Sequence, residues 1–150
     1  MPSDILLADC HTHLDQYPSA EMTEILERAG DSSVVFAVCA GTTLQSTQDC
    51  IDLADQHEPL FAGVGIHPME ARDPVTDKIY AELERMAKSS SKVVCISEVG
   101  LDYLPASPDH AVQDQVFRAH IRLARSLKLP VIFHSRESHP DVFKVLHEEN

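Results

Sequence analysis

The chain has 150 residues, of which 43% are hydrophobic, and this composition excludes a disordered chain while allowing one domain with a substantial core. Its 24 acidic and 12 basic side chains give a formal net charge of −12. That charge argues against a protein that coats nucleic acid, since such binding requires Lys and Arg to neutralise phosphates, although bound metal ions would reverse the sign locally at an active site.

Two histidines follow the first predicted strand, which covers residues 5–10. Alternate side chains of an extended chain share a face, so His11 and His13 would present their imidazole nitrogens on the same side to one metal ion. Asp9 has the same parity and is either a residue that orients His11 or a buried structural aspartate. The chemistry of the chain is therefore predicted to begin at the carboxyl end of its first strand.

Short β-branched segments alternate with longer amphipathic segments along the rest of the chain. Further strands are predicted at 34–40, 60–65, 93–97 and 131–133, and helices at 21–29, 44–56, 77–89, 112–127 and from about Pro140 onward. In the 112–127 helix one apolar stripe consists of Val116, His120, Leu123 and Leu127. This alternation is typical of a parallel α/β sheet.

Three of the later strands also end in residues suited to a site. His67 follows the third strand, Glu98 the fourth and His134 the fifth, and Arg136 lies two residues after His134. Parallel sheets form their active sites at the carboxyl ends of the strands, where the connecting loops converge. The position of these side chains therefore predicts one shared site.

The cysteine pattern and the hydropathy indicate a cytoplasmic protein without membrane contact. The cysteines at positions 10, 39, 50 and 95 form no Cys-x-x-Cys pair, and we interpret them as buried reduced thiols. No segment approaches the roughly 20 apolar residues of a membrane helix. Residues 1–4 lack the start of a signal peptide.

Four strand-end motifs together resemble those of the TatD family of metal-dependent hydrolases. They are Asp9-Cys10-His11-Thr12-His13-Leu14-Asp15, Gly65-Ile66-His67-Pro68, Ser97-Glu98-Val99-Gly100-Leu101-Asp102-Tyr103 and His134-Ser135-Arg136-Glu137. The similarity includes their order and spacing and covers essentially the whole chain. It implies a TIM-like (β/α) barrel of the amidohydrolase type, of which residues 1–150 would be the amino-terminal portion, with about five of the eight βα units.

The resemblance also implies a site with two divalent metal ions, which would be Mg²⁺, Zn²⁺ or Mn²⁺. His11 and His13 would hold the first ion, Glu98 would bridge the two ions, and His134 would bind the second. His67 would act with Glu98 in catalysis and contact the substrate.

Arg136 would be a phosphate contact in the same site. The family takes a further histidine and an aspartate from later strands, and we expect this chain to lack both. That aspartate is expected to bind metal and to accept a proton from the attacking water.

The activity implied by the resemblance is that of a deoxyribonuclease, a 3′ exonuclease that acts on DNA ends through a metal-activated water. Three alternatives stay open. The chain could be a deacylase of aminoacyl esters, a truncated paralogue that binds without turnover and self-associates through open sheet edges, or a phosphoesterase with different later ligands. Replacement of Glu98 by Gln distinguishes the phosphoesterase alternative from the TatD interpretation. It should abolish metal bridging under the TatD interpretation, which requires a carboxylate there, and should matter much less otherwise.

Overall fold

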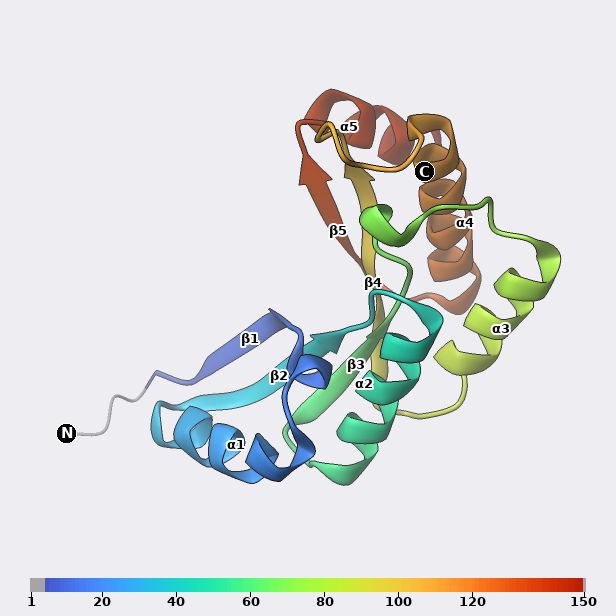
Figure 1. The fold of residues 1–150 in the computed structure, drawn as a ribbon. Helices are drawn as coiled ribbons and strands as arrows, with labels where there is room; N and C mark the ends of the chain where they lie inside the picture. The colour runs from blue at the N-terminus through green and yellow to red at the C-terminus, as the bar shows by residue number, and fades with distance from the viewer. Residues whose placement is uncertain (1–4, 150) are drawn as a thin grey trace.

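Five parallel strands form one curled sheet, and their order in the sheet is their order in the chain (Figure 1). The computed structural model describes residues 5–149, so the predicted absence of a signal peptide at residues 1–4 lies outside the described residues. The strands are β1 (Leu7–Thr12), β2 (Val34–Ala40), β3 (Leu60–Val64), β4 (Val93–Asp102) and β5 (Val131–Arg136). With every strand parallel to its neighbour, all five carboxyl ends lie at the same edge of the sheet.

Helices connect consecutive strands, and Figure 1 shows α1 to α4 along the outer side of the curled sheet. They are α1 (Met22–Asp31), α2 (Leu44–Gln56), α3 (Asp77–Ala87), α4 (His110–Leu127) and α5 (His139–Glu148), with short 3₁₀ turns η1 (Leu14–Gln16), η2 (Ser19–Glu21) and η3 (Pro68–Glu70). Within residues 5–149, none of these helices has the length and apolarity that a membrane crossing requires. The sheet thus has a covered convex face and an open concave face, which matches half of a barrel.

The core lies between the sheet and its outer helices. On α4 the predicted stripe is confirmed, because Val116, His120 and Leu123 are buried and Leu127 is half-buried. Three of the four cysteines are buried as predicted and all four are free thiols. Cys10 is exposed, which the prediction had wrong, because β1 is an edge strand whose residues 7–11 are all exposed.

Two strands continue beyond their predicted ends, and this positions the site. β4 was predicted to end at Ser97 but pairs with β5 as far as Asp102, opposite Arg136. Gly100 permits this pairing, since its φ is +142° and a Cβ there would overlap the carbonyl oxygen of His134. The first strand also begins and ends two residues later than predicted, so that His11 lies within β1.

Candidate metal centre

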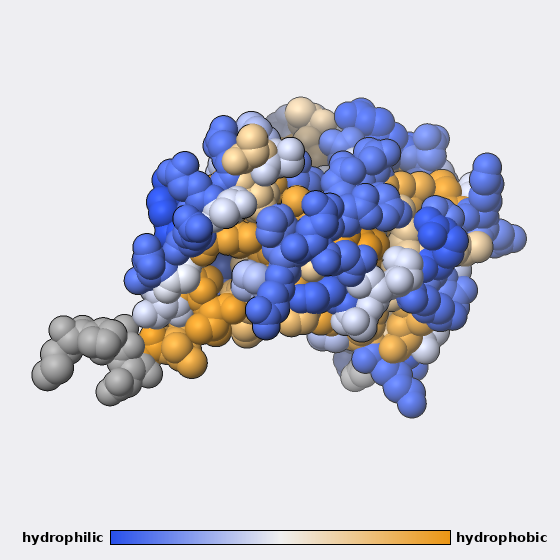
Figure 2. All heavy atoms as spheres, turned by 90° about the horizontal axis from the view of Figure 1, so that it is seen from below, coloured by the Kyte–Doolittle hydropathy of each residue, from blue (hydrophilic) through white to orange (hydrophobic). Residues whose placement is uncertain are grey.

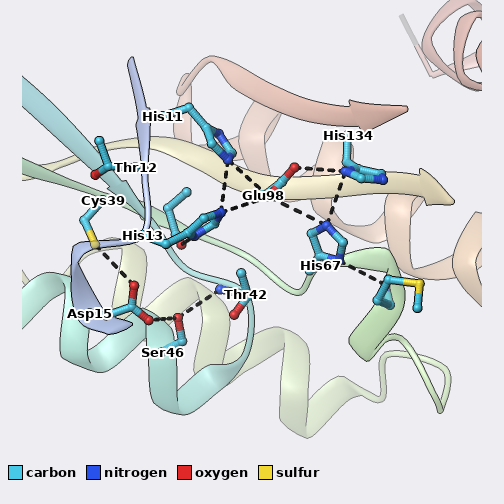
Figure 3. Close-up of polar contacts among 12 residues, drawn as sticks. His11, Thr12, His13, Asp15, Cys39, Thr42, Ser46, His67, Glu98 and His134 are labelled. Atoms are coloured by element: carbon cyan, nitrogen blue, oxygen red, sulfur yellow. Dashed lines mark hydrogen bonds and ion pairs between the residues drawn. The ribbon is translucent and has the colours of Figure 1, made fainter. Parts of the chain in front are cut away.

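Four imidazoles converge on one carboxylate at the carboxyl ends of the strands (Figure 3). His11 lies in β1, His13 directly follows it, and His67 precedes η3 after β3. Glu98 lies in β4 and His134 in β5. The five side chains that the sequence singled out as metal ligands and catalytic residues are thereby brought together.

The Glu98 carboxylate lies between two groups of histidines. Its Oε2 is 3.2 Å from His11 Nε2, 3.6 Å from His13 Nε2 and 3.7 Å from His67 Nε2. Its Oε1 is 3.0 Å from His134 Nδ1. One carboxylate therefore faces ligand atoms on both of its sides, which is the arrangement that a bridging ligand requires.

Glu98 is ionised in these surroundings although it is only 9% exposed. Burial opposes ionisation, but the hydrogen bond with His134 and the nearby imidazoles of His67 and His11 outweigh it and hold the pKa of Glu98 below its ordinary value. The carboxylate in turn raises the pKa of His134, mainly through that hydrogen bond. Metal binding at His134 Nδ1 would replace the proton that this carboxylate favours.

The ligand atoms form two overlapping groups that share Glu98. In the group of His11, His13 and Glu98 all ligand atoms lie within 4.8 Å of one another, and the same holds for His67, Glu98 and His134. Neutral imidazole nitrogens and a carboxylate are a donor set that divalent transition metals accept. The described residues therefore offer donor atoms that could hold metal.

Further contacts fix the orientation of two of the rings. His13 Nδ1 lies 3.1 Å from the carbonyl oxygen of Ala40 in β2, so it carries the hydrogen and leaves the lone pair on Nε2. His134 Nε2 lies 2.9 Å from Oδ2 of Asp102, which is 1% exposed. A carboxylate that holds the far nitrogen of a ligating histidine fixes the ring and increases its basicity.

Asp102 is a residue that the sequence interpretation did not assign to the site. It lies in β4, and its parity with Glu98 is the signal that could have placed both on one face. Burial raises its pKa, but the amide of Leu104 and the His134 ring outweigh burial and keep that pKa below the ordinary value. Asp102 is therefore a carboxylate.

His67 has the character of a hydrogen-bond donor. Its Nδ1 accepts a hydrogen bond from the backbone amide of Met69 at 3.1 Å, which leaves the ring proton on Nε2. Nε2 points into the cluster, 3.2 Å from His134 Nδ1. Burial lowers the pKa of His67 and outweighs the opposing effect of Glu98, so the ring is neutral.

Two predicted residues lie apart from the cluster. Arg136 is exposed at the end of β5, and among residues 5–149 its side chain forms no ion pair. Asp9 accepts a hydrogen bond from the backbone amide of His11 at 3.1 Å. Asp9 is exposed, so the prediction of a buried structural aspartate is wrong, and its carboxylate holds the backbone of β1.

Comparison with known proteins gives consistent matches. The family model described as TatD related DNase matches residues 8–150. The chain is 33% identical to the uncharacterized metal-dependent hydrolase YabD of Bacillus subtilis, over 96% of this chain and 56% of YabD. It is 32% identical to the 3′-5′ ssDNA/RNA exonuclease TatD of Erwinia tasmaniensis, over 82% of this chain and 47% of that protein.

A solved structure shares the fold. The crystal structure of YjjV, a TatD homologue from Escherichia coli K12, matches with a TM-score of 0.88 and 28% sequence identity, over 95% of this chain and 56% of YjjV. The predicted α/β fold of the TIM-like barrel type is confirmed, with five βα units described here. The chain spans about half the length of the relatives it matches.

Proposed function

The chain belongs to the TatD-related DNase family, and on that premise we propose that residues 1–150 are the amino-terminal portion of a single metal-dependent hydrolase barrel. Its activity is that of a deoxyribonuclease that removes nucleotides from 3′ ends of DNA. One observation carries the proposal: the four imidazoles that converge on the Glu98 carboxylate. The relative from Erwinia tasmaniensis that is named as an exonuclease supports the choice of substrate.

In this proposal His11, His13 and Glu98 hold one divalent ion, and Glu98 and His134 hold the other. Metal ions bound there would lower the pKa of a water molecule and stabilise negative charge on phosphate oxygens. The nitrogen-rich ligand set favours Zn²⁺ or Mn²⁺ over Mg²⁺, which prefers oxygen ligands. The protein's own contribution is to fix the two imidazoles whose far nitrogens are held by Ala40 and Asp102.

Two further side chains are assigned to the DNA substrate. The Nε2–H of neutral His67 is directed into the cluster and can donate a hydrogen bond to a phosphate oxygen. The exposed guanidinium of Arg136, at the end of β5, can hold a neighbouring phosphate with two parallel hydrogen bonds. The positive charge of Arg136 and that of bound metal ions would offset the net charge of −12 where the substrate binds.

The second candidate function is binding without turnover, with self-association of the chain. It is favoured by the exposed edge strand β1 and by large exposed apolar side chains, namely Ile5, Leu6, Leu7, Val35, Phe36 and Phe133. Figure 2 shows hydrophobic atoms at the surface close to the N-terminal end of the described residues. Open strand edges of this kind pair readily with another chain.

We also propose a cytoplasmic location, in keeping with the four free cysteines. Fractionation of cells that produce the protein tests it, and recovery from an oxidising compartment would contradict it.

Metal stoichiometry and DNA cleavage distinguish the two candidate functions. Three proteins are dialysed with Zn²⁺ or Mn²⁺ and analysed for bound metal, namely the wild type, His11→Ala and His147→Ala. The last is the control, because the His147 ring is exposed on α5. Each is then incubated with single-stranded DNA labelled at its 5′ end. Metal retention by wild type and control, with stepwise shortening of the DNA, supports the nuclease. Bound metal without shortening favours the binding function, and an absence of bound metal in the wild type overturns the metal centre.

A further inference from the structure

Two buried thiols lie against each other beside the metal centre. Cys39 in β2 and Cys50 in α2 have Sγ atoms 2.9 Å apart, and both residues are 0% exposed. The sulfur of a disulfide lies about 2.05 Å from its partner, so a small movement of either side chain would bring the two into bonding distance. The strand and the helix that carry them follow each other in the chain and pack together.

The same thiols are connected to the segment that follows His13. Figure 3 shows Asp15 between Cys39 and Ser46. The Cys39 thiol lies 3.6 Å from Asp15 Oδ1, and the Ser46 hydroxyl donates to Asp15 Oδ2 at 2.7 Å. The next residue after Cys39 is Ala40, whose carbonyl holds the His13 ring. A new bond at Cys39 would therefore form one residue away from Ala40, whose carbonyl holds the proposed metal ligand His13.

A third metal site is the competing interpretation of this cluster, since Asp15, Cys39 and Cys50 place their ligand atoms within 4.8 Å of one another. The sulfur separation argues against it. Two thiolates at about 2.3 Å from one tetrahedral Zn²⁺ stand roughly 3.8 Å apart, whereas these sulfurs are 2.9 Å apart. The geometry is closer to that of a disulfide than to that of a zinc site.

We propose that Cys39 and Cys50 are an oxidation site, at which a peroxide forms a disulfide that a thiol reductant reopens. The peroxide first oxidises one thiol to a sulfenic acid and is reduced, with release of water. The second sulfur then displaces the hydroxyl group, so that the S–S bond forms as the S–O bond breaks and a second water leaves. In total the two thiols give up two electrons and two protons to the peroxide.

Cys50 is held as a thiol, because the hydrogen bond with Cys39 and burial both raise its pKa. Because both are buried, we expect the reaction to be slower than oxidation of the exposed Cys10. The disulfide would also remove the Cys39 hydrogen that faces Asp15.

Peptide mapping tests the proposal on the full chain with the Cys10→Ser substitution, which removes the exposed thiol. The folded protein is treated with hydrogen peroxide, the peroxide is removed with catalase, and remaining thiols are alkylated in denaturant before digestion. We expect a linked peptide pair that contains Cys39 and Cys50, an alkylated Cys95, and loss of the link after treatment with dithiothreitol. The Cys95→Ala variant should keep the link and Cys50→Ala should lose it.

The wild type, treated in parallel, shows through oxidation of Cys10 that the peroxide was active. Full alkylation of Cys39 and Cys50 under those conditions would overturn the proposal, as would a link from either of them to Cys95 or to a second chain. The readout is independent of bound metal and of DNA cleavage, so a failure of the proposed nuclease function would leave this result intact.

Discussion

The two sides of the metal centre are supported in different ways. On the β1 side the side chains of His11 and His13 are 35% and 31% exposed, and a single backbone carbonyl holds His13. On the β5 side His67 and His134 are 17% and 19% exposed, and His134 lies between two carboxylates. Both sides thus contact Glu98, but the β5 side has a second carboxylate, Asp102, where the β1 side has only a backbone carbonyl.

Replacement of Glu98 by Gln removes the group that the two sides share, and we expect it to have the largest effect. An amide has no charge with which to hold either ion, so the metal content should fall to background on both sides, as elemental analysis after dialysis would show. Glu84→Gln is the control, because the Glu84 carboxylate pairs with Lys88 at the surface, away from the metal centre. Retention of one ion by Glu98→Gln would show that one side is independent of the carboxylate.

Acid should destabilise the fold through a buried histidine on α4. His120 of α4, which packs against β4, is fully buried, and among residues 5–149 its Nε2 has no hydrogen-bond partner. Burial lowers its pKa from 6.5 to about 4. As the pH falls, the unfolded chain therefore binds this proton before the folded chain does. The contribution of His120 to the free energy of unfolding is fully present above pH 6.5 and is lost as the pH falls toward about 4.

The expected loss is about 3 kcal/mol of unfolding free energy, measured by urea denaturation across that pH range. A His120→Gln variant should lose this part of the pH dependence. An unchanged pH profile in His120→Gln would mean that other groups cause the loss.

The Asp102→Asn substitution tests the difference in support between the two sides, and we expect it to have a smaller effect on metal binding. Asn cannot hold the His134 ring as an anion does, and loss of such a partner weakens metal affinity by roughly 10- to 100-fold. Competition with a chromophoric chelator measures the affinity of each ion. Asp9→Asn is the matched control on the β1 side, since the Asp9 carboxylate accepts a hydrogen bond from the backbone amide of His11, and we expect this substitution to leave the metal affinity unchanged. Equal effects of the two substitutions would contradict the difference in support.

The smallest expected effect concerns α2, the helix that packs on β3 and β2. Thr43 caps α2, with its hydroxyl accepting a hydrogen bond from the Ser46 amide at 3.0 Å. Thr43→Ala should cost about 1 kcal/mol of unfolding free energy in a urea titration, with metal affinity on the β5 side unchanged. A loss of metal affinity at His134 would show that α2 supports the whole centre.

The sequence predicted most of the fold because the helices and strands have strong local periodicity. Helix α2 and strand β2 have the predicted bounds, and the strand-end histidines lie where the motifs placed them. The continuation of β4 to Asp102 was missed because it depends on pairing with β5, which a polar and glycine-containing segment does not reveal locally. The Cys39 and Cys50 contact was missed for a related reason, since it depends on how a helix packs on a strand.

The order of the strands has a consequence for how the protein is synthesised. Each strand lies beside the strand made just before it, so every new strand leaves the ribosome with its pairing partner already present. The ligands emerge in the same sequence, with His11 and His13 first, Glu98 later and His134 last. The nascent chain can therefore bring together His11, His13 and Glu98 before His134 exists, and the second set of ligands is completed only when β5 has been translated.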